Sequence, residues 1–239
     1  EEAPSPLFTT CPFILGNELC ERLAYYGLAT NLVVYLTTKV GMGTSEANAQ
    51  VAYWSGSCYV TPLLGAWLSD SRLGRYRTIL LFSVIYAAGL IVLVGSTLLP
   101  PRGGGSVALL FLGLYTVAVG TGGIKPCVST FGADQFDEAV PSHRRDKGRF
   151  FNWFYLFINI GSLVASTVVV WVQENAGPRS WTIGFAIPAG AMVCAILCFL
   201  LGSSRYVHMG TAESPLSRVL QVAWTAWKHR KDEAPGGGA

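Results

Sequence analysis

The chain has 239 residues, of which 13% are charged and 51% are hydrophobic, and its mean hydropathy is +0.42. Soluble domains carry about 25% charged residues, and a soluble fold has no physical reason to gather its apolar residues into long runs. The composition therefore excludes an ordinary soluble domain and indicates a membrane protein. The net charge of +3 reflects basic residues concentrated in the predicted connections on one side of the membrane. It therefore does not indicate a nucleic-acid partner.

Six apolar segments follow one another, each near the roughly 20 residues that about 30 Å of hydrocarbon requires. They cover Phe13–Leu36, Ala47–Leu68, Thr78–Leu99, Val107–Phe131, Phe150–Val172 and Thr182–Leu201. Their apolar residues run continuously instead of alternating, which excludes a transmembrane β-barrel. Because backbone groups in lipid must be hydrogen-bonded within their own segment, the prediction is an all-α membrane protein with six transmembrane helices.

The distribution of basic residues predicts the orientation in the membrane. Twelve lysines and arginines lie in the second-to-third connection, the fourth-to-fifth connection and the tail, against three in the connections on the opposite side. By the positive-inside rule, both termini are cytoplasmic. The predicted organisation is a cytoplasmic segment 1–12, a six-helix transmembrane bundle 13–203 and a cytoplasmic segment 204–239. Apolar residues at helical spacing between Leu216 and Trp227 predict an amphipathic helix at the membrane surface.

Charged residues interrupt the first apolar segment. Glu18, Glu21, Arg22 and Tyr25 occupy positions i, i+3, i+4 and i+7 of the predicted helix, so they share one face, which Tyr26 borders. Charged side chains inside a membrane normally face protein or a water-filled cavity. Pairing of Glu18 with Arg22 at i, i+4 spares each charge an unpaired burial, but it leaves the second glutamate unexplained.

The fourth segment carries the other intramembrane charge, Lys125. The first and fourth helices run in opposite directions, so Lys125 and the charges of the first helix fall in the same, cytoplasmic half of the bilayer. Pro126 and the glycines Gly120, Gly122 and Gly123 allow the fourth helix to bend or to be approached closely. We therefore expect the charges of both helices to line one cavity.

The charges of this cluster balance. Two glutamates, one arginine and one lysine sum to zero when all are ionised, and one added proton leaves a charge of +1. A net positive cluster suits a substrate carboxylate or another anion. Burial and neighbouring cations act on a carboxyl group in opposite directions, so we expect one glutamate to exchange a proton. The alternative is a permanent ion-pair network that only holds the helices together.

Further polar positions have a structural and a functional interpretation. Tyr59 in the second helix either hydrogen-bonds a substrate or packs against its neighbours. Asn159 in the fifth helix is either part of a site or an interhelical contact. Asp70, Arg75 and Arg77 lie in the second-to-third connection, where a solvated turn at the cytoplasmic membrane edge is the simplest interpretation.

Other motifs predict no chemistry of their own. The run GTGG before Lys125 follows no strand, so close helix packing is expected there and not a phosphate-binding loop. The six cysteines show no spacing typical of a metal site, and the three histidines lie in predicted cytoplasmic segments. We predict no metal site, no catalytic residues and no enzyme.

Four stretches of the chain resemble a known family. GNELCERLAYYG resembles the ExxER-F-x-YY motif of proton-coupled oligopeptide transporters, which are grouped with the plant nitrate/peptide transporters in the major facilitator superfamily. GAWLSDSRLGRYRTI is similar to the first signature of that family, GTGGIKPCVSTFGADQFD to its fourth helix, and FFNWFYLFINIGSL to its second signature. Leu23 stands where the motif usually has phenylalanine, and Arg72 where the first signature has an apolar or aromatic residue.

The resemblance implies roles for particular residues. It implies proton coupling at Glu18, Glu21 and Arg22. It implies substrate contacts from Arg22, Tyr25, Tyr26, Tyr59, Lys125 and Asn159. It also implies a cytoplasmic gate that contains Asp70, Arg75 and Arg77. No cofactor is implied, because the proton gradient supplies the energy.

The family has twelve helices in two halves, so the resemblance implies that this chain is the N-terminal half of a major facilitator fold. Alternating access requires two halves around a central site, so a C-terminal six-helix half is an expected partner, besides the lipid bilayer and a small solute. The first residue is glutamate and not methionine, which also suggests a piece of a longer protein.

The favoured function is proton-driven symport of small peptides, a di- or tripeptide, in the plasma membrane or the vacuolar membrane. Nitrate or another small anion is the alternative substrate. From a different class, the alternative is a truncated chain that transports nothing and acts only as an interaction partner.

Overall fold

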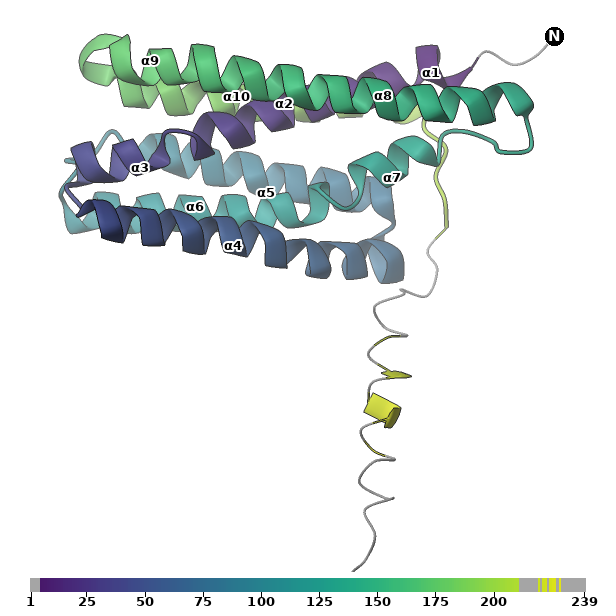
Figure 1. The fold of residues 1–239 in the computed structure, drawn as a ribbon, viewed down its shortest axis with the longest axis horizontal. Helices are drawn as coiled ribbons and strands as arrows, with labels where there is room; N and C mark the ends of the chain where they lie inside the picture. The colour runs from purple at the N-terminus through teal and green to yellow at the C-terminus, as the bar shows by residue number, and fades with distance from the viewer. Residues whose placement is uncertain (1–4, 211–218, 220, 223, 227, 229–239) are drawn as a thin grey trace, which may run out of the picture.

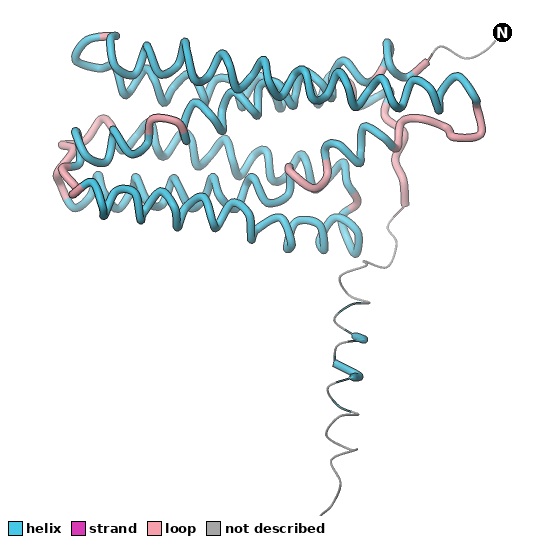
Figure 2. Tube along the Cα trace, in the orientation of Figure 1, coloured by secondary structure: helices cyan, strands magenta, loops and turns pink. Residues whose placement is uncertain are grey.

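The computed structural model describes residues 5–210 and positions 219, 221, 222, 224–226 and 228. The described part of the chain is helical throughout, with short connections (Figure 2). The expected all-α fold is therefore confirmed. Most of the amphipathic helix predicted within 204–239 lies outside the described residues.

Ten α-helices follow one another in the described part. They are α1 (Pro6–Thr9), α2 (Cys11–Ala29), α3 (Leu32–Tyr35), α4 (Thr44–Leu68), α5 (Arg75–Ser96), α6 (Gly104–Ile124), α7 (Val128–Ala133), α8 (Pro141–Val164), α9 (Val170–Asn175) and α10 (Ser180–Leu201). Short π-helical stretches extend three of them, at Leu36–Val40, Ser69–Leu73 and Ala165–Val169, and 3-10 turns cover Gly177–Arg179 and Ser203–Arg205.

The long helices form two layers (Figure 1). One layer contains α2, α8 and α10, and the other contains α4, α5 and α6, with the closest packing between α5 and α6 and between α2 and α10. Packing of α10 against α5 joins the layers. The basic connections α4–α5 and α7–α8 and the end of α10 lie at the same end of the bundle, as the charge distribution predicts (Figure 1).

Four helical stretches are long and apolar enough to cross a membrane: Arg75–Ser96, Gly104–Ala133, Pro141–Asn175 and Gly177–Arg205. The helices α2 and α4 are of comparable length but more polar. In α2 the reason is the group of charges at Glu18, Glu21 and Arg22. Length and composition of the described helices thus support four of the six predicted spans.

The prediction of one continuous first helix over Phe13–Leu36 is wrong. The helix α2 ends at Ala29, and Asn31 breaks the regular geometry with φ −117° and ψ 13° before α3 begins. Two side chains at the end of α9 form hydrogen bonds close to this break. The Gln173 amide donates to the Gly27 carbonyl at 2.7 Å, and the Asn31 amide donates to the Glu174 carboxylate at 3.3 Å.

The fourth predicted helix bends where proline was expected to permit it. The helix α6 ends at Ile124 and α7 begins at Val128, because Pro126 has no N–H to donate. The fifth helix begins earlier than the predicted Phe150. Pro141 starts α8, and its fixed φ suits the first helical position, so the charged run that follows forms helical turns.

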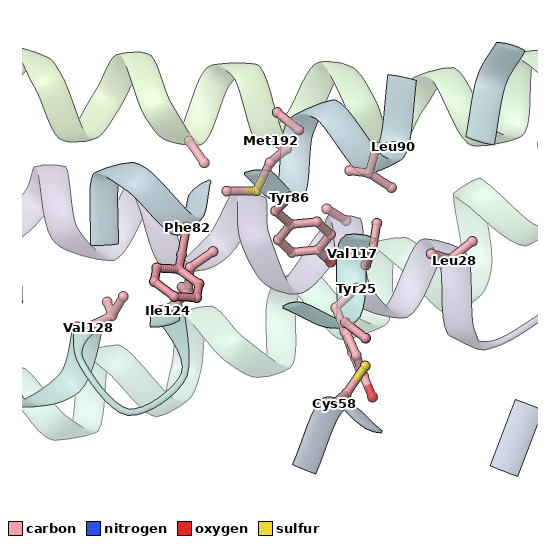
Figure 3. Packing of buried hydrophobic residues seen from close by; sticks show 14 of the residues in the cluster. Tyr25, Leu28, Cys58, Phe82, Tyr86, Leu90, Val117, Ile124, Val128 and Met192 are labelled. Carbon is pink, nitrogen blue, oxygen red and sulfur yellow. The ribbon is translucent and has the colours of Figure 1, made fainter. Parts of the chain in front are cut away.

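Glycines let α6 lie close against its neighbours. A Cβ at Gly120 would come within 2.6 Å of Tyr86 on α5, and a Cβ at Gly122 within 2.7 Å of Thr61 on α4. The Thr61 hydroxyl donates to the Ala118 carbonyl at 2.7 Å across the same interface. The expectation that the GTGG run serves helix packing is confirmed. Figure 3 shows Tyr86 beside Val117 and Met192 in the core that this packing forms.

A single methyl group should disrupt the contact between α4 and α6. A Cβ at Gly65 would overlap the backbone carbonyl of Gly122, which cannot rotate away. We predict that Gly65→Ala lowers the free energy of unfolding by about 1–3 kcal/mol, the usual cost of overpacking. Thermal unfolding of the purified protein in detergent measures this loss.

The matched control is Gly56→Ala in the same helix, where no atom lies within 4 Å of the added methyl. Alanine favours a helix over glycine by about 0.5–1 kcal/mol, so this variant should melt at the wild-type temperature or above it. Equal melting of the two variants would contradict the close approach of α4 and α6.

Candidate functional site

Arg22 is paired with both glutamates of α2. Its Nε lies 3.0 Å from Glu18 Oε1, and its Nη2 pairs with Glu21 Oε2. The side chains of Arg22, Glu18 and Glu21 are 11%, 5% and 0% exposed. A guanidinium presents several donors in a rigid fork, so one arginine can serve two carboxylates. This arrangement explains why α2 tolerates a second buried glutamate.

Lys125 comes to the same place from the break between α6 and α7. Its Nζ lies 4.4 Å from the centre of the Tyr25 ring and 4.8 Å from that of Tyr59. The guanidinium carbon of Arg22 lies 5.8 Å from the Tyr25 ring. Cations are attracted to aromatic faces at these distances. The structure thus brings α2, α4 and the α6–α7 break together around Tyr25.

Other aromatic rings hold Tyr25 in position. Its ring stacks on Trp54 of α4 with centroids 5.8 Å apart, and Tyr26 contacts it edge-on at 5.4 Å. The indole N–H of Trp54 donates to the Leu114 carbonyl at 2.8 Å, which fixes α4 to α6 behind the cluster. The sequence analysis did not select Trp54. Its spacing gave no signal, because residues five apart on a helix, such as Trp54 and Tyr59, lie about 140° apart around the axis.

The solvent exposure of the cluster residues increases from the core of the bundle to an open face. Glu21 is wholly buried, Lys125 is half-buried, and Tyr59 is 72% exposed. Asn159 on α8 is also exposed, and its amide donates to the carbonyl of Tyr155 in its own helix at 2.7 Å. Among the described contacts none joins Asn159 to Arg22 or Lys125. Its place in the site therefore stays a prediction.

The predicted gate residues surround a different polar contact. Arg75, at the start of α5, pairs with Asp134, which directly follows α7. Asp70 lies in the π-helical end of α4 and lines a cavity of about 260 Å³ together with Arg75 and Asp134. Arg77 is exposed and lines a neighbouring cavity of about 300 Å³.

Asp134 is a residue of this end that the sequence analysis missed. The signal was present, because Asp134 is the first acid of the quoted stretch GADQFD at the end of the predicted fourth helix. No three histidine, cysteine, aspartate or glutamate side chains in the described part are grouped so that they could hold a metal ion. The buried chemistry is therefore that of carboxylates, a guanidinium, an ammonium group and phenols.

Residues 76–236 match the sequence profile of the POT family (PTR2). Protein NRT1/PTR FAMILY 8.5 and Protein NRT1/PTR FAMILY 8.3 of Arabidopsis thaliana are each 47% identical to this chain, over 94% of it and 40% of their own length. The chain thus spans about 40% of the length of these curated relatives.

Solved structures show the same arrangement of helices. The crystal structure of the POT family transporter PepTSo superposes with a TM-score of 0.74 at 34% identity, over 85% of this chain and 39% of that one. An autoinhibited POT family peptide transporter superposes with a TM-score of 0.72 at 39% identity, with the same coverage of 85% and 39%. The family profile, the relatives and the shared fold agree, and the chain belongs to the POT family of transporters.

Proposed function

We propose that this chain forms the N-terminal half of a proton-coupled symporter of small peptides. The observation that carries the proposal is the cluster around Tyr25, in which Arg22 and Lys125 lie on one phenol ring and Arg22 is shared by Glu18 and Glu21. Two buried acids and two cations on the path to an open face provide both a proton acceptor and an anion site.

Proton binding and anion binding are linked through Arg22. While both glutamates are ionised, their charges hold the guanidinium. A proton on one of them removes half of this attraction, and Arg22 together with Lys125 then presents a net positive charge toward the open face. A peptide carboxylate binds this charge by charge-assisted hydrogen bonds. Each ligand strengthens binding of the other, as thermodynamic linkage requires.

The same proposal includes six membrane spans with both termini in the cytoplasm. The helices α2 and α4, with 19 and 25 residues, have lengths of about 28 and 37 Å at 1.5 Å per residue. These lengths suit the hydrocarbon core. The charged side chains of α2 are buried inside the protein, so the polar composition of α2 does not prevent it from crossing the membrane. The basic connections at one end support the orientation.

A C-terminal half completes the site in this proposal. The relatives are more than twice as long as the chain, and Tyr59 is exposed although it contacts Lys125. Alternating access needs a second bundle that moves against this face. Within the site, Asn159 is proposed as a further substrate contact, and Asp70, Arg75 and Arg77 as the cytoplasmic gate. Peptide is favoured over nitrate because a solved relative at 39% identity is described as a peptide transporter.

Removal of the shared cation should destabilise the fold. In the variant Arg22→Gln, two buried carboxylates lose their common partner, and breaking a buried ion pair costs on the order of 3–5 kcal/mol. We predict a large drop in melting temperature in detergent at neutral pH. Adding Glu18→Gln and Glu21→Gln to the same chain removes the uncompensated charges and should restore most of the loss. Persistent instability of the triple variant would contradict the charge-balance explanation.

Uptake into proteoliposomes tests the transport mechanism on the full-length protein. We predict that an inward proton gradient accelerates dipeptide uptake, that Glu21→Gln abolishes the acceleration, and that Lys125→Ala raises the peptide concentration for half-maximal uptake about tenfold or more, as the loss of a charge-assisted contact implies. Lys39→Ala, at an exposed position outside the cluster, is the control. Uptake that does not respond to pH would exclude proton coupling.

The same vesicles distinguish the substrates. Dipeptide should compete with labelled dipeptide, whereas nitrate at the same concentration should not, because it offers none of the further polar groups of a peptide to the phenols and the amide of the site. Competition by nitrate alone would support the alternative of a small-anion transporter. Vesicles that contain only residues 1–239 should show no uptake, since the second wall of the site is missing.

A further inference from the structure

Three polar side chains in the middle of the bundle lack hydrogen-bond partners. The Asn17 amide on α2 and the Tyr86 hydroxyl on α5 belong to residues that are 0% exposed, as is Glu21. In the described part of the chain, the Asn17 amide nitrogen, the Asn17 amide oxygen and the Tyr86 hydroxyl oxygen have no hydrogen-bond partner. The Glu21 carboxylate has an ion pair with Arg22 but no well-aligned hydrogen bond.

These groups converge on one region. Asn17 and Glu21 are one helical turn apart on α2, so their side chains lie on the same face. Tyr86 enters the core from α5 and lies within electrostatic range of Glu21, Arg22, Cys58 and Tyr25. Figure 3 shows its ring pointing toward Tyr25, which lies one helical turn after Glu21 on the same face of α2.

Buried polar groups in native proteins almost always have a partner. An enclosed water typically makes two to four hydrogen bonds to groups that would otherwise be unsatisfied, and it occupies polar sites of this kind. We propose that Asn17, Glu21 and Tyr86 form a binding site for an ordered water, in which Asn17 is a positioning residue for the Glu21 carboxyl group. The inference rests on the proposed role of Glu21 as a proton acceptor and deepens it.

Asn17 suits this role because its amide both donates and accepts. When Glu21 is ionised, the water donates to the carboxylate and accepts from the Asn17 amide N–H and the Tyr86 hydroxyl. When Glu21 carries the proton, its O–H donates to the water, and the water donates to the Asn17 carbonyl oxygen. The same three residues therefore serve both protonation states without a change of partner. Leucine at position 17 would serve neither.

The other titratable and charged groups around Glu21 come from three helices and the α6–α7 break. They are Glu18, Arg22 and Tyr25 on α2, Cys58 on α4, Tyr86 on α5 and Lys125 at the α6–α7 break. From α10 the neighbour that Figure 3 shows at Tyr86 is Met192, which carries no charge. Variants of Asn17 and Tyr86 leave all the charged members of this set in place.

The test is an infrared titration of the full-length protein without substrate. The carbonyl band of protonated carboxyl groups is followed against pH, and the part that Glu21→Gln removes is assigned to Glu21. A hydrogen bond to an ionised acceptor is about twice as strong as one to a neutral acceptor, so loss of the water penalises the ionised form more. We expect Asn17→Leu and Tyr86→Phe each to move the midpoint of this band toward higher pH by about half a unit or more, a threefold change in proton concentration.

Matched variants separate this effect from general disturbance. Asn175→Leu changes an exposed amide that bonds only its own helix, and it should leave the midpoint unchanged. Asn17→Ser retains a donor and an acceptor and leaves room for water, so it should restore the wild-type midpoint. Tyr86→Phe removes only one oxygen atom, so it still tests the water site if Asn17→Leu does not fold.

The outcomes are distinct. Midpoints of Asn17→Leu and Tyr86→Phe equal to that of Asn175→Leu, or a shift in only one of the two, would overturn the water site and leave proton coupling intact. An infrared band and a pH-dependent uptake that both survive Glu21→Gln would instead overturn the role of Glu21. In that case proton coupling remains but belongs to another group, such as Glu18, and the water site loses its premise.

Discussion

The pairing of one buried arginine with two buried glutamates is the constraint on which the site depends. An ion taken out of water needs close partners, and Arg22 is the partner of both Glu18 and Glu21. The Tyr25 ring and a second cation, Lys125, lie next to these ion pairs. Both Arg22 and Lys125 lie within cation–π distance of the Tyr25 ring. The formal charges of Glu18, Glu21, Arg22 and Lys125 sum to zero, which is the basis of the proposed response to a proton.

Close helix packing determines which residues can reach this cluster. Glycines of α6 allow α4 and α5 to approach at van der Waals distance, and hydrogen bonds from Trp54 and Thr61 to backbone carbonyls of α6 fix the distance. The break at Pro126 then leaves Lys125 at the end of α6, where its side chain reaches between Tyr25 and Tyr59. Backbone geometry, and not charge alone, brings the two cations to one ring.

The segment after the break also connects the cluster with the end of the bundle that carries the basic connections. Lys125 directly precedes Pro126, and Asp134 follows α7 and pairs with Arg75 at the start of α5. Beyond it, Gln135 exchanges hydrogen bonds of 3.2 and 2.9 Å with the backbone of Val207, which follows α10. One short helix, α7, thus lies between Lys125 and the residues that line the cavities at this end.

The sequence by itself determined the class of fold, the approximate positions of the helices, and the residues of the charged cluster. Apolar runs, helical periodicity and the cost of charge in lipid are local properties, so Glu18, Glu21, Arg22 and Lys125 could be selected from composition and spacing. The close-packed glycines and the bend at Pro126 also followed from local chemistry. Only the tertiary structure decided the break at Asn31, the pairing of Arg75 with Asp134 and the stacking of Trp54 on Tyr25. These features depend on partners far away in the chain, such as Glu174 and Gln173 for the first helix, which no local pattern specifies.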